Sequence, residues 1–448
     1  MTAPAPENRL VPIIALFLAL IGSASMLYYH QGLFMPGVLR VRDAGGLGNG
    51  YSFGNDFYQV WLTSREALRQ PRDLYSEPMT REIQIGLYGR PLDPSIPTDP
   101  VDRRVFPYPA YMDLLFWPSA ELSFPVARAV IVLALAALTF MSLLFWLHAL
   151  AWKLAAPWLA VIALLTFTSY PVLEALFAGQ LGLLVGFLLA AAILALRRGR
   201  LLLSGTLMAL TTIKPQMTAL VILYLLLWTL HDWRARKRFC IGLFSIGAAL
   251  LTGSLLVWPR WIQSWIHTLI AYHGYTRPPL IREVLASPLG PRAAGPATIV
   301  MFAVLMIVAM ALAWRNRDAV PNSRAFWLTL SLLLAISSIT ILPGQAVYDH
   351  IILLPGIFFL LRDWRRLRDA GRVPRMLVIV GAIVLFWPYA SAFILIVMRP
   401  LLTTQQFFST VFFSLPIRTA ASFPFTVLAL LVYTQREGLA RNGLGIGT

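Results

Sequence analysis

The amino-acid sequence predicts an all-α, polytopic membrane protein with about twelve transmembrane helices and a large first extracytoplasmic loop. Of its 448 residues, 58% are hydrophobic and only 13% are charged, against roughly 45–50% and about 25% in soluble domains. Apolar runs of roughly 17–25 residues, the length that spans a bilayer, recur along the chain. No internal repeat is evident, and residues 1–448 are expected to form one integral-membrane domain.

The first run, Leu10 to Tyr29, is too long for a signal-peptide core and lacks a small-residue cleavage site, so it is expected to be a retained helix. Several later runs are short, because Pro or Lys interrupts them. The predicted spans lie near residues 10–30, 126–150, 155–170, 181–196, 201–213, 217–230, 239–257, 298–314, 325–342, 349–361, 376–398 and 408–433.

Basic residues gather in short clusters between these runs, at residues 197–200, 234–238, 315–317 and 362–375. Short basic segments stay in the cytoplasm, so these clusters and both termini are expected on the cytoplasmic face of an inner or plasma membrane. The loss of one short span would invert everything after it. The net charge of +17 therefore reflects membrane orientation, and no nucleic-acid partner is expected.

Residues 31–125 are predicted to form the first extracytoplasmic loop, and residues 258–297 the second. In the first loop, Phe57, Val60, Trp61, Ser64 and Leu68 recur at helical spacing, which predicts a short amphipathic helix that lies in the membrane interface and ends at Pro71. A second short helix is expected over 75–88. Residues 91–107 are a Pro- and Asp-rich loop, and the apolar run 114–118 is too short to span.

Asp56, within Asn55-Asp56-Phe57-Tyr58-Gln59-Val60-Trp61, is the first candidate for chemistry. If the loop is extracytoplasmic, its carboxylate lies at the membrane surface and can act as a general base. The alternative is structural, because Asp and Asn are preferred N-caps of helices.

Lys214, in the segment Thr211-Thr212-Ile213-Lys214-Pro215-Gln216, lies between two short apolar runs with no other charge nearby. An ionisable residue at membrane depth usually lines a cavity or binds an anion. Pro215 breaks the helix at this point and frees backbone groups. The alternative is that the Lys214 side chain extends to the outer headgroups.

Tyr348-Asp349-His350 begins a later span on the same face as Gly179-Gln180 and Glu174. Beside Asp349, His350 can be held cationic and bind a phosphate, although a lone His is often structural. The His residues are too scattered to predict a metal site, and no P-loop, GxGxxG or HExxH motif supports nucleotide or zinc chemistry.

Four segments together resemble the polyprenol-phosphate-dependent GT-C glycosyltransferases, and most closely glycosyltransferase family 87, which contains alpha-1,2-mannosyltransferases. They are Asp56 to Trp61 with Leu74-Tyr75, Phe106-Pro107-Tyr108-Pro109, the block from Tyr170-Pro171 through Gly179-Gln180 to Lys214-Pro215, and Tyr348-Asp349-His350. The sequence departs from the family pattern at Ala110, where a second Pro is common, and at Gly182, where Asn is often found.

This resemblance implies a GT-C-type helical bundle that transfers a hexose such as mannose, or a pentose, from a polyprenyl-phosphate sugar to a glycan or glycolipid acceptor with inversion. Asp56 would be the general base, and Lys214 and His350 would bind the donor phosphate. The predicted substrate-binding residues are Asn55, Tyr108, Gln180, Gln216 and Asp349. No metal or other cofactor is expected.

Two other functions fit a polytopic chain with these features. A transporter or flippase of lipid-linked sugars should show pseudo-symmetric halves and charges at the bilayer midplane. A polysaccharide polymerase or ligase usually carries its large outer loop late in the chain, whereas here the large loop comes first.

Overall fold

The computed structural model describes residues 10–47, 53–69, 72–276, 280–340, 347–369 and 371–443. Every regular element within these ranges is a helix, and the ranges contain no strand. The predicted all-α class is therefore confirmed.

Within the described residues, five helical stretches are long and apolar enough to cross a bilayer. The first, Leu10–Ala44, is 35 residues long and has three parts. The stretches are α1 (Leu10–Leu27) with the π-helical η1 (Tyr28–Phe34) and α2 (Met35–Ala44), α6 (Phe124–Ala149), α12 (Trp233–Val257), most of α14 (Leu280–Arg315), and α18 (Arg372–Met398) with η4 (Arg399–Leu401).

Two bent pairs raise the number of candidate spans in the described ranges to seven if each pair crosses once. These are α7 (Ala156–Thr168) with α8 (Tyr170–Ala178), bent by 58°, and the two halves of α20 (Val411–Gly443), bent by 49°. Shorter apolar helices fill the bundle: α9 (Gly182–Arg197), α10 (Leu201–Leu210) with η2 (Thr211–Ile213), α11 (Pro215–His231) and α15 (Arg324–Thr340). These helices fit a multi-pass membrane protein, but the count of twelve spans is not confirmed.

Three predicted boundaries differ from the observed helices. The first helix does not end near residue 30, because η1 continues it with a wider turn into α2. The second predicted loop, 258–297, contains α13 (Trp261–Tyr275) and the start of α14, which is broken at Gly290. The predicted span 349–361 is instead a 3-10 segment, η3 (Val347–Leu353), followed by the nine-residue α16 (Leu354–Arg362).

The segment between the first two long stretches folds into three short helices, α3 (Asn55–Arg69), α4 (Glu77–Tyr88) and α5 (Tyr111–Ala120). Residues 91–107 form an irregular loop, as predicted. The apolar face of α3 is buried in protein rather than placed in the membrane interface: Trp61 is only 6% exposed and donates a hydrogen bond to the Leu122 carbonyl at 3.1 Å. The prediction of an interfacial α3 was wrong, because α5 and α6 cover this face.

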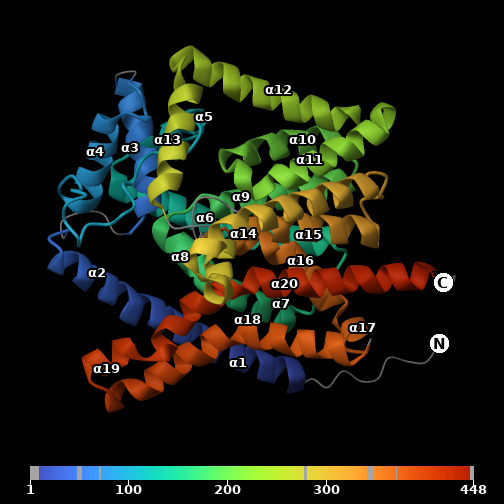
Figure 1. Cartoon of the computed structure of the whole chain (residues 1–448). Coiled ribbons are helices and arrows are strands. Elements are labelled where there is room, and N and C mark those ends of the chain that lie inside the picture. The colour runs from blue at the N-terminus through green and yellow to red at the C-terminus, as the bar shows by residue number, and fades with distance from the viewer. Residues whose placement is uncertain are drawn as a thin grey trace.

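The bundle has two distinct ends. Figure 1 shows α3, α4 and α13 on one side of the molecule, while α17 (Trp364–Asp369), the start of α1 and the end of α20 lie on the other. Contacts bring the basic clusters close together at the second end: Arg236 donates to the Arg317 carbonyl at 3.3 Å, and Arg197 bonds Asn322, which lines the same cavity as Arg362. The predicted gathering of basic clusters and helix ends at one end of the bundle is therefore present.

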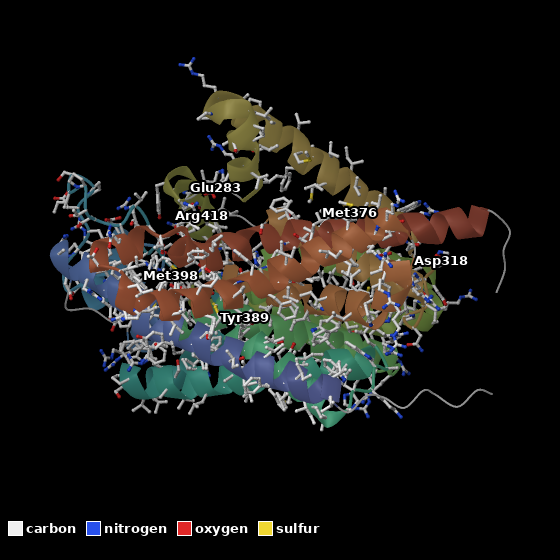
Figure 2. The ribbon with its side chains drawn as sticks, turned by 90° about the horizontal axis from the view of Figure 1, so that it is seen from below. Glu283, Asp318, Met376, Tyr389, Met398 and Arg418 are labelled. Carbon is white, nitrogen blue, oxygen red and sulfur yellow. The ribbon has the colours of Figure 1, made fainter. Side chains whose placement is uncertain are left out.

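Along α18, Figure 2 shows Met376 toward one end, Tyr389 midway and Met398 at the other end. Tyr389 packs into the interior and donates a hydrogen bond to the Leu165 carbonyl of α7. Ile379, Ile383 and Phe386 on the same helix are about half exposed, at 52%, 55% and 48%. An apolar side chain exposed on such a long helix fits contact with lipid hydrocarbon.

Candidate functional site

A polar cavity of about 240 Å³ lies where the first outer segment meets the helical bundle. Its walls come from α3, the 91–107 loop, the Gly179-Gln180 turn, the η2–α11 junction, α13 and η3. Six of the eight sequence-predicted site residues line it: Asp56, Tyr108, Gln180, Lys214, Gln216 and Asp349. Segments far apart in the sequence therefore meet at one place.

Asp56 lies in the first turn of α3, and its side chain is 12% exposed. One carboxylate oxygen accepts a hydrogen bond from Arg104 Nη1 at 2.8 Å, and the other accepts one from Gln180 Nε2. The predicted alternative, in which the Asp56 carboxylate caps α3, is not what the structure shows. Instead, the Gly54 carbonyl accepts the hydrogen bond from the Tyr58 backbone N–H at 2.9 Å.

Gln180 follows the turn that ends α8. Gly179 adopts φ +69°, a left-handed conformation that glycine reaches without strain, and its Cα lies against Phe57: a Cβ there would come within 2.8 Å of the Phe57 Cβ. This turn directs the Gln180 amide between two charged groups, with Nε2 donating to Asp56 and Oε1 accepting from Lys214 Nζ at 2.9 Å.

Lys214 lies at the break between η2 and α11, where Pro215 is the first residue of α11. Its side chain is 5% exposed, and Nζ donates to Asp349 Oδ1 at 2.6 Å. Nζ also lies 5.1 Å from the centre of the Tyr348 ring. The Lys214 side chain therefore points into the cavity and does not extend to outer headgroups.

Asp349 accepts this hydrogen bond with one oxygen, while Oδ2 is buried without a partner among the described residues. Gly182 leaves the room that the carboxylate needs, because a Cβ at this position would lie 2.2 Å from Asp349 Oδ1. The departure from the family pattern at Gly182 is thus matched by the space that Asp349 occupies.

Arg104 was not predicted from the sequence. It has φ +57°, an uncommon conformation for a residue with a side chain, and its backbone N–H bonds Asp102 Oδ1 at 3.0 Å. The guanidinium donates to the Tyr88 hydroxyl at 2.9 Å and to Asp56 at 2.8 Å. The one feature of the sequence that could have indicated Arg104 is its position just before the Phe106-Pro107-Tyr108-Pro109 turn, which already resembled a family motif.

The pKa of Asp56 reflects opposing effects. Burial raises the pKa of its carboxyl above the usual value, while the positive charge of Arg104 and the Gln180 hydrogen bond act in the opposite direction. A raised pKa makes a carboxylate a stronger base, provided that it still ionises at the working pH.

Helix α13, within the second predicted loop, contributes Trp265, Leu269 and Tyr272 to the cavity wall. The indole N–H of Trp265 donates to the Pro107 carbonyl at 3.0 Å and so fastens α13 to the turn before Tyr108. These residues were not predicted from the sequence, because α13 is distant in the chain from Asp56 and carries no motif.

Two predicted site residues do not line this cavity. Asn55 precedes Asp56 on α3, and its Oδ1 is buried without a partner among the described residues. His350 lines a second, mainly apolar cavity of about 140 Å³ between α7, α8, α16 and α18, together with residues such as Leu165, Pro388 and Tyr389. The structure therefore does not bring His350 to Asp56.

No group of three or more His, Cys, Asp or Glu side chains that could hold a metal ion occurs in the described part of the chain. The charged side chains that line the cavity are three carboxylates, Asp56, Asp102 and Asp349, and two cations, Arg104 and Lys214. Arg104 pairs with Asp56 and Lys214 pairs with Asp349, while Gln180 lies between Asp56 and Lys214. This arrangement can accept a proton at Asp56 and offer positive charge nearby.

Comparison with known families identifies the chain. The family model described as Glycosyltransferase family 87 matches residues 106–342, which is just over half of the sequence. The chain belongs to glycosyltransferase family 87. It is therefore a GT-C-like membrane glycosyltransferase, an enzyme that uses a sugar donor and an acceptor. No curated relative and no solved structure matches it.

The match to family 87 covers the turn at Phe106, the Gly179-Gln180 block and Lys214, but it ends before Asp349 and begins after Asp56. Asp56 is thus linked to the matched region by tertiary contacts, through Gln180 above all.

Proposed function

We propose that this family 87 enzyme transfers a hexose, with mannose as the first candidate, or a pentose, from a polyprenyl-phosphate sugar to a glycan or glycolipid acceptor on the extracytoplasmic face. One observation carries the proposal. Asp56 and Lys214, a base and a cation separated by a long stretch of sequence, meet in one cavity through Gln180. Family membership supports sugar transfer itself.

The reaction would be a single displacement with inversion. The acceptor hydroxyl oxygen attacks the anomeric carbon, its proton passes to Asp56, and the bond between the anomeric carbon and the phosphate oxygen breaks. The polyprenyl phosphate leaves with the bonding electron pair. Because this leaving group is already a stable anion, the mechanism requires no protein acid.

Positive charge is needed where the phosphate departs. Lys214 faces the cavity, but its charge is offset by Asp349 at 2.6 Å. Arg104 is the second cation of the wall, and we assign it to the leaving phosphate together with Lys214. Tyr108, Gln180 and Gln216 line the space in between and would hydrogen-bond to the sugar. Asn55 does not line the cavity, so any effect on substrate binding would be indirect, through the neighbouring Asp56.

The apolar cavity beside His350 supports a lipid-linked donor, since a soluble nucleotide sugar has no chain to place in it. Asp349 and His350 are consecutive residues of η3 and face different cavities. In this proposal the carrier chain enters the apolar cavity, and His350 Nδ1, which has no partner among the described residues, meets the phosphate end of that chain.

The donor is tested with purified protein in lipid nanodiscs and a panel of polyprenyl-phosphate sugars, each with and without an acceptor glycolipid. We expect one donor to be consumed, with release of polyprenyl phosphate, and much slower consumption by Asp56→Asn. Consumption of a nucleotide sugar instead would overturn the donor class. Movement of intact lipid-linked sugar without bond cleavage would favour a flippase.

The face of the membrane is tested by cysteine labelling. Cys240 is buried and is the chain's single cysteine, so Cys240→Ser gives a cysteine-free background. Ile96, in the loop beside Arg104, is 37% exposed. In that background, Ile96→Cys should react with a membrane-impermeant maleimide in intact cells. Labelling only after the cells are opened would place the cavity in the cytoplasm and overturn the proposal.

A further inference from the structure

A second polar cavity, of about 370 Å³, lies at the end of the bundle away from Asp56. Its lining comes from the start of α15, the end of α16 and the first turn of α17, all of which lie toward the end of Figure 1 that carries α17. It shares no residue with the cavity that contains Asp56 and Lys214.

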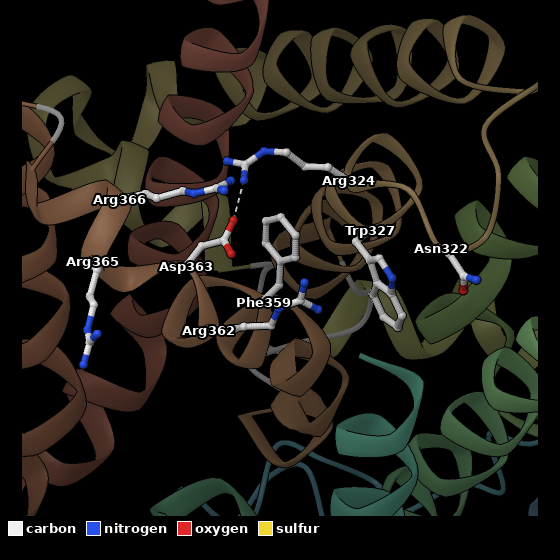
Figure 3. Close-up of a pocket in the computed structure, with 8 residues that line it drawn as sticks. All are labelled: Asn322, Arg324, Trp327, Phe359, Arg362, Asp363, Arg365 and Arg366. Carbon is white, nitrogen blue, oxygen red and sulfur yellow. Dashed lines mark hydrogen bonds and ion pairs between the residues drawn. The ribbon is translucent and has the colours of Figure 1, made fainter. Parts of the chain in front are cut away.

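Four arginines line this cavity against a single aspartate. Arg324 pairs with that aspartate, Asp363, as the dashed line in Figure 3 shows. Arg366 extends toward this pair in the same view, whereas Arg365 points away from it. Neither Arg365 nor Arg366 has an ion-pair partner within the described residues, so the cavity carries excess positive charge.

Simple membrane orientation does not explain this arrangement. Basic residues that only fix topology extend freely into water. Here Arg324 lies over the buried Phe359 ring, with its guanidinium carbon 5.5 Å from the ring centre, and Trp327 is also buried. Arg362 Nη1 is held by the Leu150 carbonyl. Aromatic packing and a backbone contact thus hold the guanidinium groups of Arg324 and Arg362 beside a concave space, which the exposed Arg365 and Arg366 also line. Together these groups can bind an anion with several hydrogen bonds.

The surroundings indicate how the anion arrives. Leu361 and Trp364, next to the cavity residues in sequence, are 38% and 42% exposed, and Val373 and Met376 at the start of α18 are 60% and 66% exposed. Trp residues favour the interface between headgroups and hydrocarbon. A ligand that places a phosphate in the arginine cavity and acyl chains against this apolar surface matches both the positive charge of the cavity and the exposed apolar side chains beside it.

We propose that the arginine cavity binds the phosphate headgroup of an anionic membrane lipid. Arg362 and Arg366 donate hydrogen bonds to the phosphate oxygens, and Trp327 and Phe359 form the floor. The site is separate from the sugar-transfer cavity and takes a lipid of the membrane itself.

The test uses full-length protein in detergent, titrated with dioleoyl phosphatidylglycerol or dioleoyl phosphatidylcholine, with bound lipid counted by native mass spectrometry. We expect wild type to retain phosphatidylglycerol in preference to phosphatidylcholine. Arg362→Gln/Arg366→Gln should weaken phosphatidylglycerol retention by about tenfold or more, because charge-assisted hydrogen bonds are lost. Arg238→Gln, which removes an exposed arginine outside this cavity, should change retention less than about twofold.

Since Arg362 also bonds the Leu150 carbonyl, Arg366→Gln alone is the variant to use if the double variant does not fold. Equal retention by wild type and the cavity variants overturns the proposal, as does an equal loss in Arg238→Gln, which would mean diffuse attraction. In a second arm, inorganic phosphate and pyrophosphate are added to lipid-free micelles. These ions could stabilise wild type but not Arg366→Gln against thermal unfolding, while wild type retains no phosphatidylglycerol. That result would assign the cavity to a soluble phosphate and overturn the proposal of a lipid ligand.

Discussion

Arg104 donates a hydrogen bond of 2.8 Å to Asp56 from a point 48 residues further along the chain. The contact joins the irregular 91–107 loop to the first turn of α3 and occupies one of the two oxygens of the proposed base. A base must present a free lone pair to its substrate. During the proposed reaction, Arg104 can therefore donate to either of two groups, the Asp56 carboxylate or the departing phosphate.

Replacing Asp56 with Asn should leave a folded protein with little sugar-transfer activity. The amide keeps the size of the side chain but cannot take a proton, and loss of a general base typically costs roughly 10²–10⁴-fold in rate. The measurement is the initial rate of polyprenyl phosphate release. Asp43→Asn, at an exposed position on α2 outside the cavity, is the matched control and should be fully active. Near-normal turnover by Asp56→Asn removes the residue from the mechanism.

Arg104→Gln should move the acid limb of the activity profile to higher pH. Burial already raises the pKa of Asp56, and the positive charge of Arg104 is the largest effect that opposes it. Without this charge the protonated form is favoured further, so the base loses its proton only at higher pH. The measurement is kcat/KM against pH. A limb that stays in place or moves to lower pH contradicts the assigned electrostatics.

Lys214→Met should reduce stability and raise the donor KM. The substitution leaves Asp349 buried without its partner, which typically costs roughly 3–5 kcal/mol. Lys214→Met/Asp349→Asn removes both charges, so thermal unfolding should recover much of the loss while the donor KM stays high. If the double variant regains wild-type donor dependence, Lys214 has a structural role alone.

Gly182→Ala should disrupt the same ion pair by sterics, since the new Cβ would lie 2.2 Å from Asp349 Oδ1. We expect a lower unfolding midpoint and reduced activity. Gly247→Ala is the control: this helical glycine of α12 has nothing within 4 Å of an added Cβ, and Ala in a helix interior gains about 0.5–1 kcal/mol over Gly. Equal behaviour of the two variants would mean that Asp349 can move without consequence.

Asp113 offers a test of pH-dependent stability outside the cavity. Burial raises the pKa of its carboxyl well above the usual range, although hydrogen bonds from Thr63 and Ser64 act to lower this pKa. The neutral carboxyl stabilises the fold fully at low pH, and this stabilisation is lost as the pH rises through the raised pKa.

Asp113→Asn, which stays neutral, should therefore gain stability relative to wild type as the pH increases from about 4. Thermal unfolding at several pH values measures this difference. Asp93→Asn should instead lose stability relative to wild type only as the pH rises toward about 4 and should show no further change above it, because a side-chain hydrogen bond from Ser95 lowers the pKa of the Asp93 carboxyl. A constant difference for Asp113→Asn would show that this carboxyl is ionised in the folded protein.

The sequence by itself determined the all-α class, the membrane character and the family. Apolar runs and basic clusters are local features, and the Gly179-Gln180 and Lys214-Pro215 motifs lie within the matched region. The short helix that begins at Asn55 was also predictable, since helical periodicity is set by neighbouring residues.

Only the tertiary structure decided how the charges pair. Arg104 reaches Asp56 because an irregular loop, which no periodicity predicts, folds back over α3. The same holds for Trp265 of α13, which closes the cavity against Pro107, and for His350, which adjoins Asp349 in sequence but faces another cavity. The helix bends and the π-helical and 3-10 segments were also decided there, because they depend on packing between helices rather than on hydropathy.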